Sequence, residues 1–94
     1  MHIAALSIEL RLPGCRTLKD KRSALKSLLA AIHREFNVSA AELDHLDDIH
    51  SSVIACAAVS NDPAHVQRVL GRIPGWVEDR RPDLQVIDSA LSMR

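Results

Sequence analysis

The residues of this sequence that are best suited to chemistry are cations in the first third of the chain. When residues 18–35 are drawn as a helix at about 100° per residue, four cationic side chains fall within roughly 60° of one another. They are Lys19, Arg22, Lys26 and His33, and Arg16 comes shortly before them. At a rise of about 1.5 Å per residue the helical set extends about 20 Å, which is comparable to several phosphate spacings of a nucleic acid. These five residues are called the basic row.

The distribution of charge favours contact between the basic row and a polyanion. The chain has 12 basic and 12 acidic side chains and a formal net charge of zero, so no whole-molecule field attracts nucleic acid or an anionic membrane. Residues 1–36 carry seven basic and three acidic side chains, whereas residues 37–61 carry four acidic side chains and no lysine or arginine. The alternative is a solvated helix face, because lysine and arginine are also good helix formers.

The scarcity of aromatic residues predicts that RNA bases are not read. A sheet that stacks bases needs aromatic side chains on its central strands, and the sequence has only Phe36 and Trp76. Phe36 falls on the apolar stripe of the first predicted helix, and Trp76 lies near the second. Lysine and arginine can bind phosphates without reading bases. Any contact with nucleic acid should therefore be directed to the backbone and low in sequence specificity.

Metal and thiol chemistry are weaker candidates. Cys15 and Cys56 are too far apart in sequence for a zinc motif or a redox pair. Cys15 lies beside Arg16 and near a helix start, which both lower a thiol pKa, but we interpret it as a surface thiol and Cys56 as a core residue.

The turn at 44–48 (DHLDD) and His50 group carboxylates with imidazoles. Without an EF-hand spacing or a glycine in that turn, a solvated turn is favoured over a metal site. No metal or cofactor is predicted.

The elements that position these residues follow from the spacing of apolar side chains. Residues 2–12 alternate apolar and polar, which predicts a strand with one buried face, and Pro13-Gly14 ends it. Thr17 and Asp20 predict a capped helix start. The helix over 18–35 has a single apolar stripe, formed by Leu18, Leu25, Leu28, Leu29 and Ile32 together with Phe36. Lys21 lies at the edge of this stripe and is expected to extend its charge towards solvent.

The second half of the chain supplies three more strands and a second helix. Residues 37–43 predict a short edge strand, and residues 49–60, which are apolar on both parities, predict a central one. Asp62-Pro63 predicts a helix start. Pro74, between two glycines, should kink or break that helix. Residues 84–93 form the last strand, with Ile87, Leu91 and Met93 on one parity.

The resulting order, βαββαβ, predicts a ferredoxin-like α+β sandwich. Two right-handed crossovers give a four-stranded antiparallel sheet of order 4-1-3-2 with both helices on one face. The 94 residues fit a single domain, 1–94. The other face of the sheet must be polar or covered by a partner. The first strand presents four side chains there: Ala5, Ser7, Glu9 and Arg11.

No catalytic constellation is found. P-loop, GxSxG, HExxH and dinucleotide-binding glycine motifs are absent. Acylphosphatases share the predicted fold, but the segment at 12–17 (LPGCRT) lacks their glycine-rich phosphate loop. The acidic pairs at 47–48 and 78–79 are adjacent in sequence, which does not direct both carboxylates into one cleft. The sequence therefore predicts a non-enzymatic protein without a small-molecule substrate.

Four segments in this order resemble the YlxP-like bacterial domain of unknown function. They are residues 8–13 (IELRLP), 17–29 (TLKDKRSALKSLL), 36–45 (FNVSAAELDH) and 59–62 (VSND). The resemblance implies a ferredoxin-like fold. It also implies a ribosomal or RNA setting, because genes of this family often lie beside ribosome-maturation and translation-initiation genes. The Gly71–Pro74–Gly75 segment departs from the uninterrupted helix that is usual in the family. The resemblance supplies no catalytic residues.

These observations predict a small cytoplasmic binding module. The apolar N-terminal run contains Glu9 and Arg11 and so matches neither a signal peptide nor a membrane span. The expected partner is ribosomal RNA or a ribosomal subunit, contacted by Arg16, Lys19, Arg22, Lys26 and His33. The alternative is a protein-interaction module or homodimer that uses the open sheet face or an edge strand.

Overall fold

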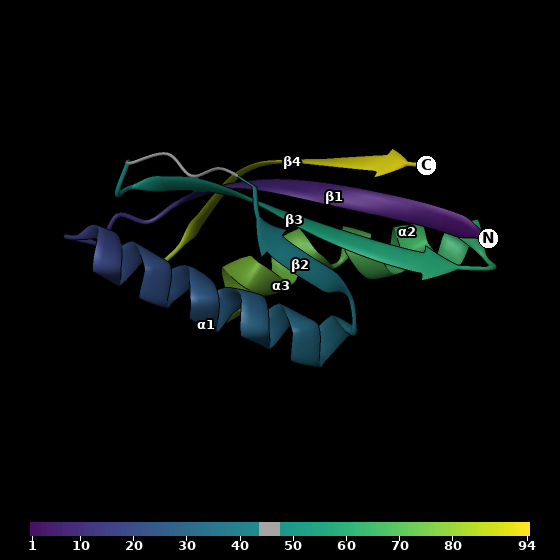
Figure 1. Ribbon diagram of the computed structural model, residues 1–94, viewed down its shortest axis with the longest axis horizontal. Coiled ribbons are helices and arrows are strands. Elements are labelled where there is room, and N and C mark those ends of the chain that lie inside the picture. Colours follow the sequence, from purple (N-terminus) through teal and green to yellow (C-terminus); the bar gives the residue numbers. More distant parts are fainter. Residues whose placement is uncertain (44–47) are drawn as a thin grey trace.

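The computed structural model describes residues 1–43 and 48–94, which form one sheet covered on one side by helices (Figure 1). The elements, in chain order, are β1 (His2–Arg11), α1 (Leu18–Phe36), β2 (Ser39–Glu42), β3 (Ser51–Ser60), α2 (Pro63–Gly71), α3 (Ile73–Arg80) and β4 (Gln85–Met93). The strands are antiparallel in the order β2-β3-β1-β4. This is the order 4-1-3-2 read from the other edge, so the predicted ferredoxin-like topology is confirmed.

The core lies between the sheet and the helices. The even-numbered side chains of β1 from Ala4 to Leu10 are buried, as the alternation predicted, and Ile8 and Leu10 are fully inaccessible to solvent. On β3 the sequence left open which parity faces the core. Ile54 and Cys56 are buried on the helical side, opposite Ile8 and Leu6 of β1. The odd-numbered residues of β3 therefore line the open face.

The ends of α1 are fixed by local hydrogen bonds. The Thr17 side chain accepts from the Asp20 backbone N–H at 3.0 Å, and the Asp20 carboxylate accepts from the Thr17 N–H at 3.2 Å. This is the predicted capping box, with aspartate in the position where glutamate is commoner. At the other end Asn37 adopts a left-handed conformation with φ of 51°, which ends the helix. Because Asn37 ends α1, β2 begins at Ser39, two residues later than the sequence predicted.

The predicted interruption of the second helical segment is a break. Asp62 caps α2 by accepting from the Ala64 N–H at 3.0 Å, and α2 ends at Gly71. Pro74 lies in the first turn of the next helix, α3, where its missing N–H costs no hydrogen bond. The break allows Trp76 on α3 to pack edge-to-face against Phe36 at the end of α1, with ring centroids 5.3 Å apart. Both aromatic rings therefore belong to the helical layer and not to the sheet.

The β4 strand forms a long edge of the sheet. It pairs with β1 from Gln85 to Met93, with an irregularity at Ile87, where Glu9 pairs with Asp88 but Leu10 pairs with Val86. The three apolar residues that share a parity in the sequence are all partly exposed: Ile87 at 47%, Leu91 at 43% and Met93 at 38%. This strand therefore contributes much less to the core than β1 or β3.

Candidate nucleic-acid interface

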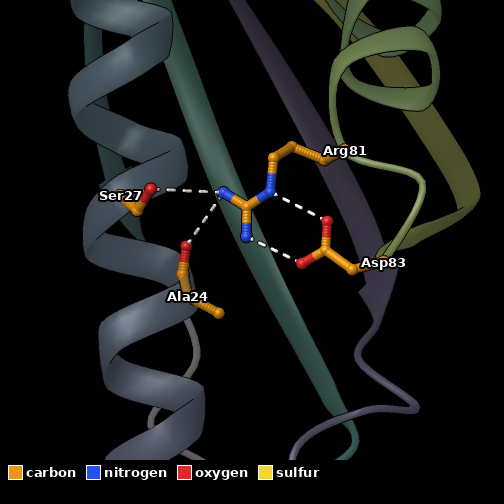
Figure 2. A network of polar contacts seen from close by, with 4 residues as sticks. All are labelled: Ala24, Ser27, Arg81 and Asp83. Carbon is orange, nitrogen blue, oxygen red and sulfur yellow. Dashed lines mark hydrogen bonds and ion pairs between the residues drawn. The ribbon is translucent and has the colours of Figure 1, made fainter.

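The basic row lies on the flank of α1 that faces away from α3. The other flank is identified by Arg81, at the end of α3, which donates to the Ala24 carbonyl and the Ser27 hydroxyl of α1 (Figure 2). At about 100° per residue, Arg22 and Lys26 lie on the opposite side of the buried stripe from these two residues. The basic row therefore lies on the side of α1 opposite α3. At this end of the sheet α1 contacts the edge strand β2 (Figure 1).

All five predicted side chains of the basic row are exposed. They are Arg16, Lys19, Arg22, Lys26 and His33. None of these side chains forms a hydrogen bond or ion pair with another residue in the parts of the chain that the structure describes. The structure thus places four of the five on one helical flank, as the spacing predicted, and leaves them exposed. Arg16 lies outside the helix, and its backbone N–H donates to the Asp20 carboxylate at 3.0 Å.

Lys21 differs from the basic row although it lies among its residues in sequence. The side chain is only 3% exposed, and Nζ donates to the Asp48 carbonyl at 2.8 Å. The prediction that Lys21 extends its charge to solvent from the edge of the apolar stripe is therefore wrong. The reason is tertiary: Asp48, shortly before β3, lies against α1 and supplies an acceptor for the buried ammonium group. A charge-assisted hydrogen bond of this kind stabilises more than a neutral one.

The segment that enters β3 is held by a local hydrogen-bond network. The Asp48 carboxylate accepts from the His50 backbone N–H at 2.9 Å and from the Ser51 hydroxyl at 2.7 Å. These hydrogen bonds, the backbone one first, hold the pKa of Asp48 below its ordinary value. The His50 ring nitrogen Nε2 lies 3.0 Å from the Cys15 carbonyl oxygen. Asp48 and His50 therefore contact the start of α1 and the residues just before it, at Lys21 and Cys15.

The candidate metal site and the two cysteines are the other groups considered for chemistry. Residues 44–47 of the acidic turn lie outside the described residues, and the described residues contain no cluster of His, Cys, Asp or Glu able to hold a metal ion. The prediction that Cys15 is a surface thiol is wrong, and its pKa is not lowered by the neighbouring Arg16 and helix start. The residue is 9% exposed, and burial first, then the Asp20 carboxylate, raises its pKa. Cys56 lies in the core as predicted, and burial raises its pKa to about 11.

A network that the sequence did not indicate fixes the opposite flank of α1. Arg81 and Asp83 form a two-point ion pair, with Nε–Oδ1 and Nη2–Oδ2 distances of 3.0 and 2.9 Å (Figure 2). The third guanidinium nitrogen, Nη1, points towards α1, 3.4 Å from the Ser27 hydroxyl and 3.5 Å from the Ala24 carbonyl. The two segments are more than fifty positions apart, so no local spacing could have revealed this contact.

The centre of the open face of the sheet is built from small side chains. Ala5 of β1 pairs with Ala57 of β3, and Ser7 pairs with Ala55. These residues line two shallow depressions of about 230 Å³ each. No described helix covers this face (Figure 1). It carries no aromatic side chain, because both aromatic residues of the chain are in the helical layer.

The topology, the single helical layer and the open sheet face define a ferredoxin-like α+β domain. The chain belongs to the family described as protein of unknown function (DUF503), which matches residues 3–91. It is 30% identical over 69 residues to the uncharacterized protein YlxP of Bacillus subtilis (strain 168). That similarity covers 73% of this chain and 74% of the relative. In the described part of the chain, no helix is both long and apolar enough to cross a membrane.

Proposed function

We propose that this protein binds the phosphate backbone of structured RNA through the basic row on α1, and that ribosomal RNA is its target. The observation that carries the proposal is the exposure of four lysine and arginine side chains and His33, which have no protein partner in the described residues. Phosphate binding by such side chains requires no base contact and no deep cleft. The ribosomal part of the proposal rests on the gene neighbourhood that the family resemblance implies.

The placement of the aromatic residues supports contact with the backbone over contact with bases. Phe36 and Trp76 pack against each other between α1 and α3 and are not available as a stacking platform. The open sheet face presents alanine and serine where an RNA-binding sheet of this topology would present aromatic rings. Low discrimination between RNA sequences of similar shape therefore follows from the proposal.

The test is binding to small ribosomal subunits and to a structured RNA over a series of salt concentrations. Four phosphate contacts predict a slope of about −3 to −4 in a plot of log affinity against log salt concentration. The variant Lys19→Glu/Arg22→Glu/Lys26→Glu should weaken binding at least about tenfold and reduce the slope to about −1. Far-UV circular dichroism verifies that the variant is folded.

A matched control separates the position of the charges from their number. The variant Arg11→Glu/Arg68→Glu/Arg80→Glu changes the net charge equally, but it alters exposed residues of β1, α2 and α3. This control should retain most of the affinity. Failure of the wild-type protein to bind at low salt, or equal losses in the two triple variants, would refute the assignment to α1.

A second candidate is self-association through the open sheet face. It is favoured by the small side chains there, because paired alanines such as Ala5 and Ala57 allow another sheet to approach closely. Ala57→Glu places a charge in the centre of that face and should abolish such a dimer. Sedimentation of this variant and the wild-type protein at equal concentration is the test. Self-association that is insensitive to Ala57→Glu would exclude the open face.

A further inference from the structure

The free edge of β4 has the features of a pairing surface. In the described residues the sheet ends at β4, which pairs with β1 on one side only. An edge strand presents unpaired backbone N–H and C=O groups that can pair with another strand. Proteins usually protect such edges with proline, lysine or a bulge. Residues 85–93 contain neither proline nor lysine, and the irregularity at Ile87 affects only the first part of the strand.

The backbone groups that face outward can be identified from the register. The Arg94 N–H donates to the Ile3 carbonyl at 2.7 Å, so Arg94 faces β1. Since orientation alternates along an antiparallel strand, Ser92 and Ala90 also face β1. Met93, Leu91 and Ser89 then direct their N–H and C=O groups away from the sheet. In agreement, the Ser89 N–H donates to the adjacent Asp88 carboxylate at 2.9 Å and not to β1.

The charges near this edge are unbalanced within one copy. Glu9 and Asp88 are directly opposite each other on the open face, and like charges in this position are destabilising. Neither carboxylate forms an ion pair with a described residue. A cation placed beside Asp88 from outside the edge would therefore be favourable. Such a cation lies six residues further along the chain, at Arg94, directly after the end of β4.

We propose that a second copy of this chain pairs antiparallel with the β4 edge, with the two Leu91 residues facing each other at the two-fold axis. Each Asp88 then lies opposite Arg94 of the other copy, twice by symmetry. Met93 lies diagonal to Leu91 of the other copy, so four partly exposed apolar side chains meet on the helical side. Asp88 and Arg94 form a pair without backbone hydrogen bonds at this edge, where opposing side chains are closest.

This register continues the sheet through both copies with all helices on the same side. The outward N–H and C=O groups of Ser89, Leu91 and Met93 find partners in the other copy. In the dimer the Ser89 N–H no longer donates to the Asp88 carboxylate but to a carbonyl group of the other copy. The Asp88 carboxylate is then available to Arg94 of the other copy. The interaction is independent of the basic row on α1 and does not rest on the proposed RNA binding.

The first test is sedimentation velocity from low micromolar to millimolar concentration at moderate salt. The wild-type protein should pass from monomer to dimer as concentration rises. Asp88→Arg places arginine opposite arginine and should weaken the dimer at least about tenfold. The variant Asp88→Arg/Arg94→Asp exchanges the charges and should restore it. Circular dichroism verifies folding, and both changed residues are exposed in the monomer.

The second test identifies the surface without relying on charge variants. Hydrogen exchange followed by NMR at low and high concentration should show protection of the Leu91 and Met93 amides that increases with concentration. The Ala90 and Ser92 amides, which face β1, should be protected at both concentrations. Ala57→Glu on the open face should leave both the dimer and this alternation unchanged.

Several outcomes would overturn the proposal. A protein that stays monomeric over the whole range excludes this dimer. A dimer abolished by Ala57→Glu but not by Asp88→Arg is a face-to-face dimer. Failure of the charge exchange to restore the dimer excludes this register. The Leu91 and Met93 amides could also be protected from hydrogen exchange only when an extended peptide of another sequence is added. That result would assign the β4 edge to a different partner.

Discussion

The contact between Arg81 and α1 predicts a measurable coupling between segments that are distant in sequence. We expect Arg81→Ala to reduce the free energy of unfolding by about 1.5 kcal/mol. Of this, the ion pair with Asp83 contributes about 0.5–1 kcal/mol. This value is low because the two side chains are 20% and 54% exposed. The long hydrogen bonds to Ala24 and Ser27, and the packing of the arginine stem, contribute the remainder.

The assay is thermal and urea unfolding of a double-mutant cycle. For a domain of this length, a loss of about 1.5 kcal/mol lowers the Tm by about 6–12 °C. Arg81→Ala, Asp83→Ala and the double variant together isolate the ion pair, with an expected coupling energy of about 0.5–1 kcal/mol. Arg68→Ala, which removes an exposed arginine from α2, is the matched control and should change stability by no more than about 0.5 kcal/mol.

The pH dependence of the coupling tests its electrostatic origin. The hydrogen bonds from Arg81 lower the pKa of Asp83 in the folded state below its unfolded value. A carboxyl with a lowered folded pKa stabilises the protein above the unfolded pKa of about 4 and loses this contribution as pH falls through the folded pKa. The coupling should therefore be complete at neutral pH and decrease in acid. A coupling of the same size at neutral pH and at a pH well below the folded pKa would contradict the assigned ion pair.

Two further predictions concern buried groups near the N-terminus of α1. Lys21→Met retains the apolar stem but removes the hydrogen bond to the Asp48 carbonyl. The free energy of unfolding, measured by urea titration, should therefore decrease by about 1.5–3 kcal/mol. Unchanged stability would refute a structural role of this lysine. Because burial raises the pKa of Cys15, with a contribution from Asp20, its alkylation at neutral pH should be much slower than that of a small free thiol and should accelerate on unfolding. Rapid alkylation of the folded protein, located by mass spectrometry at Cys15 and not Cys56, would be inconsistent with the buried position.

The fold could be predicted because each element is specified by its own residues. The alternation of β1, the apolar stripe of α1 and the Thr17 and Asp62 caps act over distances of a few residues. The break before Pro74 is equally local, since the ring removes a backbone donor at a defined position. A helical face is also a local property, so the common flank of Lys19, Arg22 and Lys26 followed from spacing alone.

Other features depend on segments that meet only when the chain folds. The position of Cys15 between a strand and a helix, beside Arg16, predicts a surface thiol, but the core of the folded domain covers it. Lys21 is buried because Asp48, shortly before β3, lies against α1 and offers the ammonium group its carbonyl oxygen. The contact of Arg81 with Ala24 and Ser27 joins the end of α3 to α1 in the same way.

The sequence by itself therefore determined the elements, their order and the faces that local periodicity defines. The tertiary structure decided which parity of β3 is buried, which cations are paired, and that the apolar residues of β4 remain at a free edge. The physical reason is that periodicity and capping depend on neighbouring residues. Burial and hydrogen-bond partnership depend on segments that are distant along the chain and are brought together only by folding.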